Sequence, residues 1–260
     1  MSRVAIVTGA ARGIGAAVVD ALVNDGFKVL AVDRCRDIAD VPYPLATPAD
    51  LDSVVARHGD SVLGLVGDVR SATDMSLAVE TATRHFGRLD AAVAVAGVIT
   101  GGVPLWEMTD ASWDAVWSVN VLGTRRLIEA AVPVMLKSDR RDGRIVAVAS
   151  AAGQLGLRHL AAYSAAKHAV VGMVRGVAMD LAETGITANV VSPGSTKTPI
   201  LEASARLYGL ASTAAFAEQQ PIGRLLDPSE PAAMIAWLCS PASSAATGAV
   251  FAVDGGMTVN

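Results

Sequence analysis

The residues best suited to chemistry are a serine, a tyrosine and a lysine that stand close together in the chain. Ser150 ends an apolar run, Tyr163 follows it by thirteen residues, and Lys167 comes four residues after the tyrosine. A tyrosine and a lysine at positions i and i+4 share one helix face. Because a nearby cation favours the phenolate, such a pair can exchange a proton near neutral pH. The alternative is that Tyr163 and Lys167 are an ordinary helix pair without a catalytic role. Other motifs in the chain are needed to choose between the two interpretations.

A second candidate site is the glycine-rich stretch TGAARGIG, from Thr8 to Gly15. It stands between a β-branched run and a helical pattern, where a dinucleotide-binding turn is found. Gly9 permits the tight turn, Gly13 lets a pyrophosphate approach the backbone, and Gly15 lets the helix pack on the strand. The first N–H groups of the helix would then bind phosphate. The spacing G-x-x-x-G-x-G fits the general fingerprint loosely, so the position between strand and helix carries most of the weight.

Asp33 bears on which dinucleotide would bind. It ends the second expected strand, eighteen residues beyond Gly15. A carboxylate there hydrogen-bonds the ribose hydroxyls and repels a 2′-phosphate, so Asp33 predicts NAD rather than NADP. Arg12 and Arg34 are the counter-argument, because an arginine near this point can accept a 2′-phosphate. A plain acid at a strand end is the structural alternative.

Composition narrows the function classes. The 260 residues are 52% apolar and 18% charged, which is typical of a globular enzyme with a large core. The formal charge is −4 without a basic run, so nucleic acid is not an expected partner. Scattered histidines and two distant cysteines, Cys35 and Cys239, predict no metal site and a reducing compartment. The chain shows neither a membrane-span pattern nor a signal peptide, so we expect a cytoplasmic protein without a membrane partner.

Strand and helix patterns alternate along the chain. This alternation predicts an α/β fold: a Rossmann-type, doubly wound parallel sheet of about seven strands with helices on both faces, in one domain over residues 1–260. The expected strands are Val4–Thr8, Lys28–Asp33, Val62–Gly67, Asp90–Ala96, Arg144–Ala149, Thr187–Ser192 and Ala249–Val253. The expected helices are Ile14–Asn24, Pro48–His58, Ala72–Phe86, Ala111–Leu136, Leu160–Thr184, Ile200–Leu207 and Glu230–Cys239.

Two segments exceed what this fold needs. About 14 residues separate Asp33 from the helix expected at Pro48, whereas such loops usually have about 2–6. A functional loop and a tolerated surface insertion are both consistent with that length. Residues 196–220 read as a mobile, largely apolar substrate lid within the domain, which favours a hydrophobic alcohol or ketone over a sugar or an acid.

Together these motifs resemble the short-chain dehydrogenase/reductase family over essentially the whole chain. Thr8–Gly15 is similar to its TGxxxGxG turn, Asn120 to its active-site asparagine, and Ser150, Tyr163 and Lys167 to its catalytic residues. The resemblance implies a hydride transfer between NAD and a substrate carbon. The cofactor site that it implies consists of Gly9, Arg12, Gly13, Ile14, Gly15, Asp33, Arg34, Asp68, Val69, Ala96, Gly97, Tyr163, Lys167, Pro193, Gly194, Thr196 and Thr198.

The resemblance also assigns roles to the catalytic tetrad. Tyr163 would be the acid/base, and Lys167 would lower the pKa of that phenol and bind the nicotinamide ribose. Ser150 would hydrogen-bond the substrate oxygen. Asn120 would hold a water that links Lys167 to solvent, with a bracing core amide as the alternative.

The substrate side is less marked in the sequence. Gln154, Leu155 and His159 lie between the serine and the tyrosine, so we expect them to border the substrate. Trp106 is a further candidate wall, although a large aromatic side chain is more often part of the core.

The chain departs from the family pattern at one motif, and it carries an additional segment at another place. Ala94–Gly97 reads AVAG where the family has NNAG, which predicts altered packing near the adenosine. The segment from Val32 to Leu51 resembles a subgroup associated with the redox cofactor mycofactocin, whose members carry an insertion here over a tightly held NAD. That resemblance implies a mycofactocin-type electron acceptor as a partner.

Three functions stay open at this point. The leading one is an NAD-dependent dehydrogenase of a small hydrophobic secondary alcohol or ketone. A 3-oxoacyl-carrier-protein reductase would instead prefer NADPH and use a basic docking patch, to which Arg125 and Arg126 could contribute. A redox sensor that binds NAD without turnover would not need the tyrosine–lysine pair. The family resemblance also implies a homotetramer that pairs the helices expected at 111–136 and 160–184.

Overall fold

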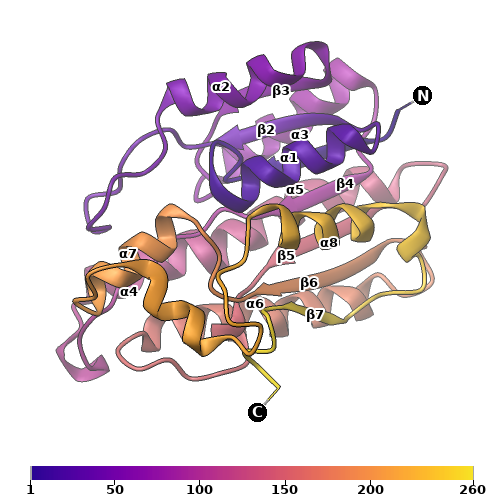
Figure 1. The fold of residues 1–260 in the computed structure, drawn as a ribbon. Helices are drawn as coiled ribbons and strands as arrows, with labels where there is room; N and C mark the ends of the chain where they lie inside the picture. Colours follow the sequence, from indigo (N-terminus) through magenta and orange to yellow (C-terminus); the bar gives the residue numbers. More distant parts are fainter. Residues whose placement is uncertain (1, 260) are drawn as a thin grey trace.

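The computed structural model describes residues 2–259 and is built around one parallel sheet (Figure 1). Seven strands lie in the order β3-β2-β1-β4-β5-β6-β7 within these residues, and each neighbouring pair is parallel. Their bounds are β1 Val4–Thr8, β2 Lys28–Asp33, β3 Val62–Val66, β4 Ala91–Ala94, β5 Arg144–Val148, β6 Thr187–Pro193 and β7 Val250–Val253. This is the Rossmann-type doubly wound sheet that the alternation of patterns predicts.

Both faces of the sheet are buried, which explains why the central strands are continuous apolar runs. Successive side chains of a strand point to opposite faces. In β1, Val4 and Ile6 accordingly belong to one core cluster, while Ala5 and Val7 belong to the other. A strand between two apolar layers has no polar face, so it lacks the alternating pattern of a half-exposed strand.

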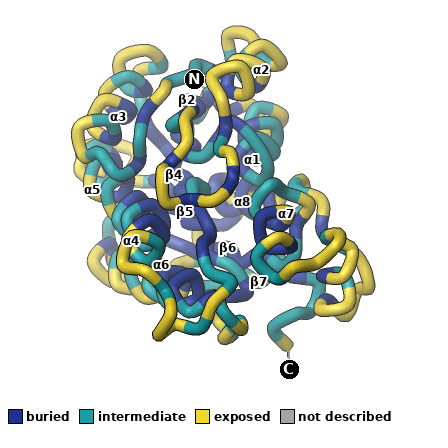
Figure 2. The backbone as a smooth tube through the Cα atoms, turned by 90° about the vertical axis from the view of Figure 1, so that its left-hand side faces the viewer, coloured by how far each residue is buried: buried dark blue, intermediate teal, exposed yellow. Residues whose placement is uncertain are grey.

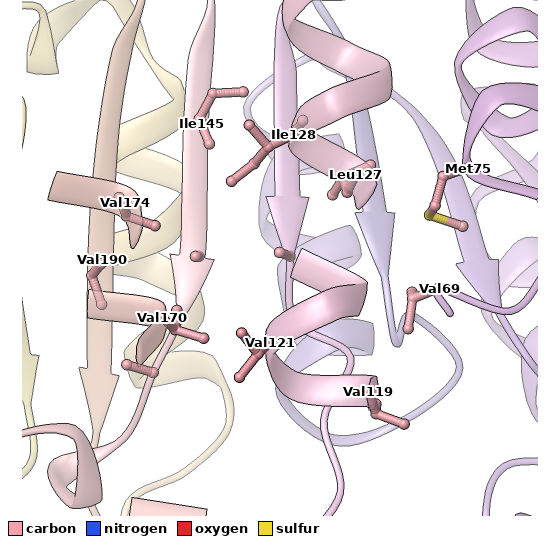
Figure 3. Packing of buried hydrophobic residues seen from close by; sticks show 14 of the residues in the cluster. Val69, Met75, Val119, Val121, Leu127, Ile128, Ile145, Val170, Val174 and Val190 are labelled. Atoms are coloured by element: carbon pink, nitrogen blue, oxygen red, sulfur yellow. The ribbon is translucent and has the colours of Figure 1, made fainter. Parts of the chain in front are cut away.

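Helices cover the two faces in two sets. One set packs with β1 residues Ala5 and Val7, and consists of α1 (Gly13–Asn24), α2 (Pro48–His58) and α8 (Ser229–Cys239). The other set consists of α3 (Ala72–Phe86), α4 (Asp110–Trp117), α5 (Gly123–Leu136) and α6 (Ala161–Asp180). Figure 3 shows side chains of α5 and α6, among them Leu127 and Val170, packed along the strands of this second face.

The long helix expected over Ala111–Leu136 is interrupted in the structure. A wider, π-helical turn, η3 (Ser118–Leu122), separates α4 from α5 and contains Asn120. Such turns are frequent at functional sites, because they redirect one side chain within a helix. The helix expected to reach Thr184 ends instead at Asp180, where a turn with Glu183 at φ 65° leads back to β6.

The strand expected over Asp90–Ala96 is shorter than predicted. It ends at Ala94, because the next two main-chain N–H groups donate to the Thr8 hydroxyl at 3.3 and 3.4 Å instead of to a neighbouring strand. The strands β2 and β5 lie on either side of the β1–β4 pair, so connections leave in opposite directions there. A crevice at the carboxyl ends of such strands is where ligands bind in open α/β sheets.

Two segments stand over this carboxyl edge, which faces the viewer in Figure 2. The first runs from Arg34 to Thr47, between β2 and α2. Its last residue, Thr47, forms a capping box with Asp50 at the start of α2. The second segment follows β6 and contains α7 (Pro199–Leu207) and the 3₁₀ turn η5 (Thr213–Gln219). Within residues 2–259, no helix has the length and apolar character needed to cross a membrane.

Candidate active site

Ser150, Tyr163 and Lys167 come together at the carboxyl edge of the sheet. Ser150 follows β5, and its hydroxyl accepts a hydrogen bond from the Ala152 main-chain N–H at 3.1 Å. Tyr163 and Lys167 lie on the first turns of α6, where both are buried. The Ser150 hydroxyl is hydrogen-bonded to the Tyr163 phenol. Ser150 and Tyr163, which are thirteen residues apart in sequence, thus lie close together at this edge, and their catalytic roles stay predictions.

The protonation of this pair is set by burial. Burial raises the pKa of Tyr163 to about 12, although the hydrogen bond to Ser150 lowers it. Burial also lowers the pKa of Lys167 to about 8. The lysine Nζ lies 5.7 Å from the centre of the tyrosine ring and donates to the Val148 carbonyl at 2.9 Å. In the chain alone the phenol therefore holds its proton, and an additional positive charge is needed to make it a base near neutral pH.

Asn120 is held by main-chain contacts at the end of β4. Its side-chain oxygen accepts from the Val98 N–H at 2.8 Å, and its side-chain nitrogen donates to the Val98 carbonyl at 3.0 Å. Both functional groups of the amide are thus engaged. These contacts are those of an amide that braces the core, which is one of the two roles considered for Asn120. The other role, binding a water that links Lys167 to solvent, stays a prediction.

The glycine-rich turn is packed so closely that only glycine fits. A Cβ on Gly9 would lie 2.7 Å from the Ala96 Cα, and one on Gly15 would lie 1.9 Å from the Gly9 carbonyl oxygen. Gly9 also has a φ of 66°, in the region that favours glycine. The helix α1 begins at Gly13, and no side chain caps its N-terminus. Its free N–H groups are therefore available to an anion, as a dinucleotide pyrophosphate requires.

One cavity joins the glycine-rich turn to the tyrosine. All the residues predicted to bind the cofactor line it: Gly9, Arg12, Gly13, Ile14, Gly15, Asp33, Arg34, Asp68, Val69, Ala96, Gly97, Tyr163, Lys167, Pro193, Gly194, Thr196 and Thr198. Ser150 lines it as well. The cavity runs from the free N–H groups of α1 to Tyr163 on α6, so it joins an end that can bind an anion to an end that carries a phenol, as the chemistry of a nicotinamide dinucleotide requires.

The comparison with known families agrees with this geometry. Residues 9–258 match the family described as enoyl-(acyl carrier protein) reductase. The chain belongs to the short-chain dehydrogenase/reductase family. An NAD-dependent oxidoreductase of Mycobacterium tuberculosis is 36% identical over 98% of this chain and 95% of its own length. The cis-4-hydroxycyclohexanecarboxylate dehydrogenase of Sinomonas cyclohexanicum is 37% identical over 98% and 96%.

Among solved structures, the carveol dehydrogenase of Mycobacterium avium in complex with NAD superposes with a TM-score of 0.93. It is 30% identical, and the match covers 99% of this chain and 98% of that one. Similarity of this extent, over the whole cavity, makes the protein an NAD-dependent oxidoreductase of the short-chain dehydrogenase/reductase family.

In this dehydrogenase, the acid predicted to meet the adenosine ribose is fixed by main-chain donors. One carboxylate oxygen of Asp33 accepts from the Ala11 N–H at 3.1 Å, and the other accepts from the Cys35 N–H at 3.2 Å. The carboxylate thus lies beside the first turn of the glycine-rich loop. Its negative charge at this place disfavours a 2′-phosphate.

The substrate side of the cavity is apolar. Its wall consists of Leu157, Leu160, Ile200, Leu201, Tyr208 and Phe216. The sequence pointed to the loop before α6 and to residues 196–220, but not to these individual side chains. Gln154, Leu155 and His159 are absent from the lining, and their role in substrate binding stays a prediction. Trp106 was wrongly considered as a wall, because it is 85% exposed and does not line the cavity.

The segment from Arg34 to Thr47 forms part of the cavity as well. Ile38, Leu45 and Ala46 line it. Tyr43 is 7% exposed, and its hydroxyl accepts a hydrogen bond from the Ile99 N–H at 2.9 Å. The Arg12 guanidinium donates to the Pro44 carbonyl at 2.9 Å. A tolerated surface insertion would not bury its side chains in this way, so the segment is a wall of the site.

Proposed function

We propose that the protein interconverts a small hydrophobic secondary alcohol and the corresponding ketone with NAD as the hydride carrier. When bound, the nicotinamide ring supplies a carbon that accepts or returns the hydride. The observation that carries the proposal is the apolar wall facing the Ser150–Tyr163 pair. A substrate of this class needs one polar contact at its oxygen and an apolar surface everywhere else.

The chain's own residues account for the proton and for orientation. During oxidation Tyr163 takes the hydroxyl proton of the alcohol while the carbon loses its hydride, and in reduction it returns that proton to the ketone oxygen. Ser150 donates a hydrogen bond to the same oxygen as negative charge develops there. Lys167 provides the nearby cation and a contact for the ribose, and Asn120 fixes the strand end beside it.

Three of the relatives support a ring alcohol as the substrate class. One acts on a hydroxycyclohexanecarboxylate, and two others are named for carveol. An alicyclic ketone is compact and largely apolar, which suits the wall formed by Leu157, Leu160 and Tyr208. We propose that residues 196–220 act as the lid that closes over it, within a single domain spanning residues 1–260.

A second candidate is the reduction of a 3-oxoacyl carrier protein. The carrier-protein reductase of Vibrio cholerae is 33% identical over 98% of this chain, which favours it. The candidate docking patch is weaker, because Arg125 is paired with Glu129 at 2.6 Å. Steady-state rates with NADH and NADPH on alicyclic ketones and on an acetoacetyl thioester separate the two. Preference for NADPH and the thioester would reject the dehydrogenase proposal.

We propose further that the segment Arg34–Thr47 retains NAD between turnovers, and that a mycofactocin-type acceptor then takes up the electrons. Ile38, Leu45 and Ala46 line the cavity, and the hydrogen bond between Tyr43 and the Ile99 N–H holds the segment in place. Both observations support retention of NAD. The test is whether purified protein keeps NAD through a desalting column. Loss of all cofactor in that step would reject retention and remove the need for an acceptor that reaches bound NADH.

We also propose a cytoplasmic homotetramer that pairs α4, α5 and α6 of one copy with those of another. Met179 on α6 is 75% exposed, and a Cβ on Gly172 or Gly176 would meet nothing within the chain. Small residues on an open helix face allow another helix to approach closely. Light scattering at micromolar concentration is the test, and a monomer there would reject this assembly.

A further inference from the structure

Two arginines line the adenosine end of the cavity, although the protein belongs with NAD-dependent enzymes. They are Arg12 and Arg34. An arginine at this end is the side chain that usually accommodates the 2′-phosphate of NADP. The carboxylate of Asp33 opposes such a phosphate, but two neighbouring cations would offset much of one negative charge. The selectivity for NAD therefore needs a second cause.

Two of the three nitrogens of the Arg34 guanidinium already have partners. Its Nε lies 2.9 Å from a carboxylate oxygen of Asp68, and its side chain is 19% exposed. One terminal nitrogen donates to the main-chain carbonyl of Arg36 at 3.2 Å and also to that of Asp37. A phosphate bound by two guanidinium nitrogens at once would have to use Nε or this terminal nitrogen, so it would have to displace Asp68 or the carbonyls. This partly buried ion pair resists separation, because Arg34 would lose its charged partner in a place that water reaches only in part.

Asp68 is itself locked in position by Arg70. One of its oxygens accepts from the main-chain N–H and from the Nε of Arg70, both at 3.0 Å. The other accepts from an Arg70 terminal nitrogen at 2.7 Å, and the Asp68 side chain is 13% exposed. The carboxylate is thus held by one arginine and presented to the other. It cannot turn away to release Arg34 without losing several charge-assisted hydrogen bonds.

Arg12 is directed elsewhere by a weaker contact. Its guanidinium donates to the Pro44 carbonyl, which is a single hydrogen bond to a neutral group. The ion pair of Arg34 is the stronger of the two restraints, because both of its partners are charged.

We infer that Asp68 is a specificity-determining residue, which keeps NADP out by holding Arg34 in an ion pair away from the 2′-phosphate position. Asp33 repels that phosphate, and Asp68 withholds the cation that would bind it. This inference goes beyond the proposed function, because it requires nothing about the substrate, the lid or the electron acceptor.

The test is a competition between the two cofactors. Protein is incubated with equal concentrations of NAD and NADP until the bound ratio stops changing, and the bound cofactor is released with acid and quantified by chromatography. No substrate is added, so failure of the proposed reaction would not affect the result. The variants are Asp33→Ala, Asp68→Asn, both together, and both together with Arg34→Ala.

We expect Asp33→Ala alone to raise the NADP:NAD ratio modestly. The Asp33→Ala/Asp68→Asn variant should raise it at least about tenfold further, which is the scale of one recovered charge-assisted contact. Adding Arg34→Ala should abolish that gain. Asp68→Asn also weakens contacts that serve both cofactors, but such a loss cancels in the ratio.

Two single variants test the same point without removing Asp68. Arg70→Gln loosens Asp68 but keeps its carboxylate beside Arg34, so it should raise the ratio less than Asp68→Asn does. Arg34→Gln in the parent should leave the ratio unchanged, because its guanidinium is already withheld. The inference is overturned if the double variant matches Asp33→Ala, if the gain survives Arg34→Ala, or if Arg34→Gln lowers the parent ratio.

Discussion

The Tyr43 hydroxyl accepts a hydrogen bond from the Ile99 main-chain N–H at 2.9 Å, although 56 residues separate the two in sequence. Ile99 lies one position beyond Val98, whose main chain is held by Asn120. The segment between β2 and α2 is therefore fastened to the same stretch of chain that Asn120 braces. Movement of this segment has to break a buried hydrogen bond beside the catalytic groups.

Replacing Tyr43 tests whether that bond controls cofactor release. Tyr43→Phe leaves a buried N–H without an acceptor, which typically costs about 1–3 kcal/mol. We expect the NAD dissociation rate to rise by about tenfold or more, as measured by stopped-flow displacement. Tyr208→Phe is the matched control, because it removes a hydroxyl that donates to the Arg158 carbonyl on the lid side. An equal effect of both variants would show that the Tyr43 bond has no particular role.

Deleting residues 35–46 and bridging the gap with two glycines removes this wall altogether. We expect NAD release to accelerate far more than the hydride-transfer step changes, because the glycine-rich turn, Ser150 and Tyr163 stay in place. The measurement compares the NAD off-rate with single-turnover rates in parent and variant. An unchanged off-rate in a folded variant, or a parent that already exchanges NAD within milliseconds, contradicts retention by this segment.

The proton role of Tyr163 is tested by removing one oxygen. Tyr163→Phe should lower kcat by at least about a thousandfold and leave NAD affinity nearly intact, since only the transferable proton is lost. Steady-state rates and a fluorescence titration with NADH measure the two quantities. Activity within tenfold of the parent would exclude Tyr163 as the acid/base.

Lys167 predicts how the stability of the cofactor-free protein depends on pH. Its pKa is lowered to about 8 by burial, from 10.5 in a free side chain. Between these values the unfolded chain binds a proton at this lysine that the folded chain does not, so Lys167 contributes a rise of up to about 1.4 kcal/mol per pH unit to the free energy of unfolding. The buried Cys35 and Cys239 thiols, whose pKa is raised by burial, contribute with the opposite sign above about pH 9. Lys167→Met should remove this rise, and the exposed Lys197→Met should keep it. Urea unfolding from pH 8 to 10 measures it, and equal slopes in all three proteins would contradict the prediction.

The sequence predicted the fold well, and it placed Tyr163 and Lys167 on one helix face, because both results depend on local patterns. Buried parallel strands are short apolar runs, and Tyr163 and Lys167 meet through the period of a single helix. The break at Asn120 could not be read in the same way. The segment SVNVLG continues a helical pattern, and only the structure shows the π-helical turn whose Asn120 side chain contacts the Val98 main chain.

The apolar wall and the ion pair at Asp68 were not predictable from the sequence. Arg34 follows the end of β2, and Asp68 follows the end of the neighbouring strand β3. Only the fold brings the Arg34 guanidinium to the Asp68 carboxylate. Trp106 had the right chemical character for a wall but lies outside the cavity. Residue type indicates what a side chain can do, while the fold determines which cavity it reaches.

The elements at both ends of the segment between β2 and α2 are stabilised by local hydrogen bonds. At the end of β2, the Asp33 carboxylate accepts hydrogen bonds from two main-chain N–H groups. At the start of α2, Thr47 and Asp50 form a capping box. The sheet and helix therefore do not depend on the length of what joins them. Natural variation can lengthen, shorten or replace this connection without rebuilding the fold. For the same reason, this segment could be grafted into a related enzyme in place of the connection found there. We expect such a graft to change the rate of cofactor release without changing the fold.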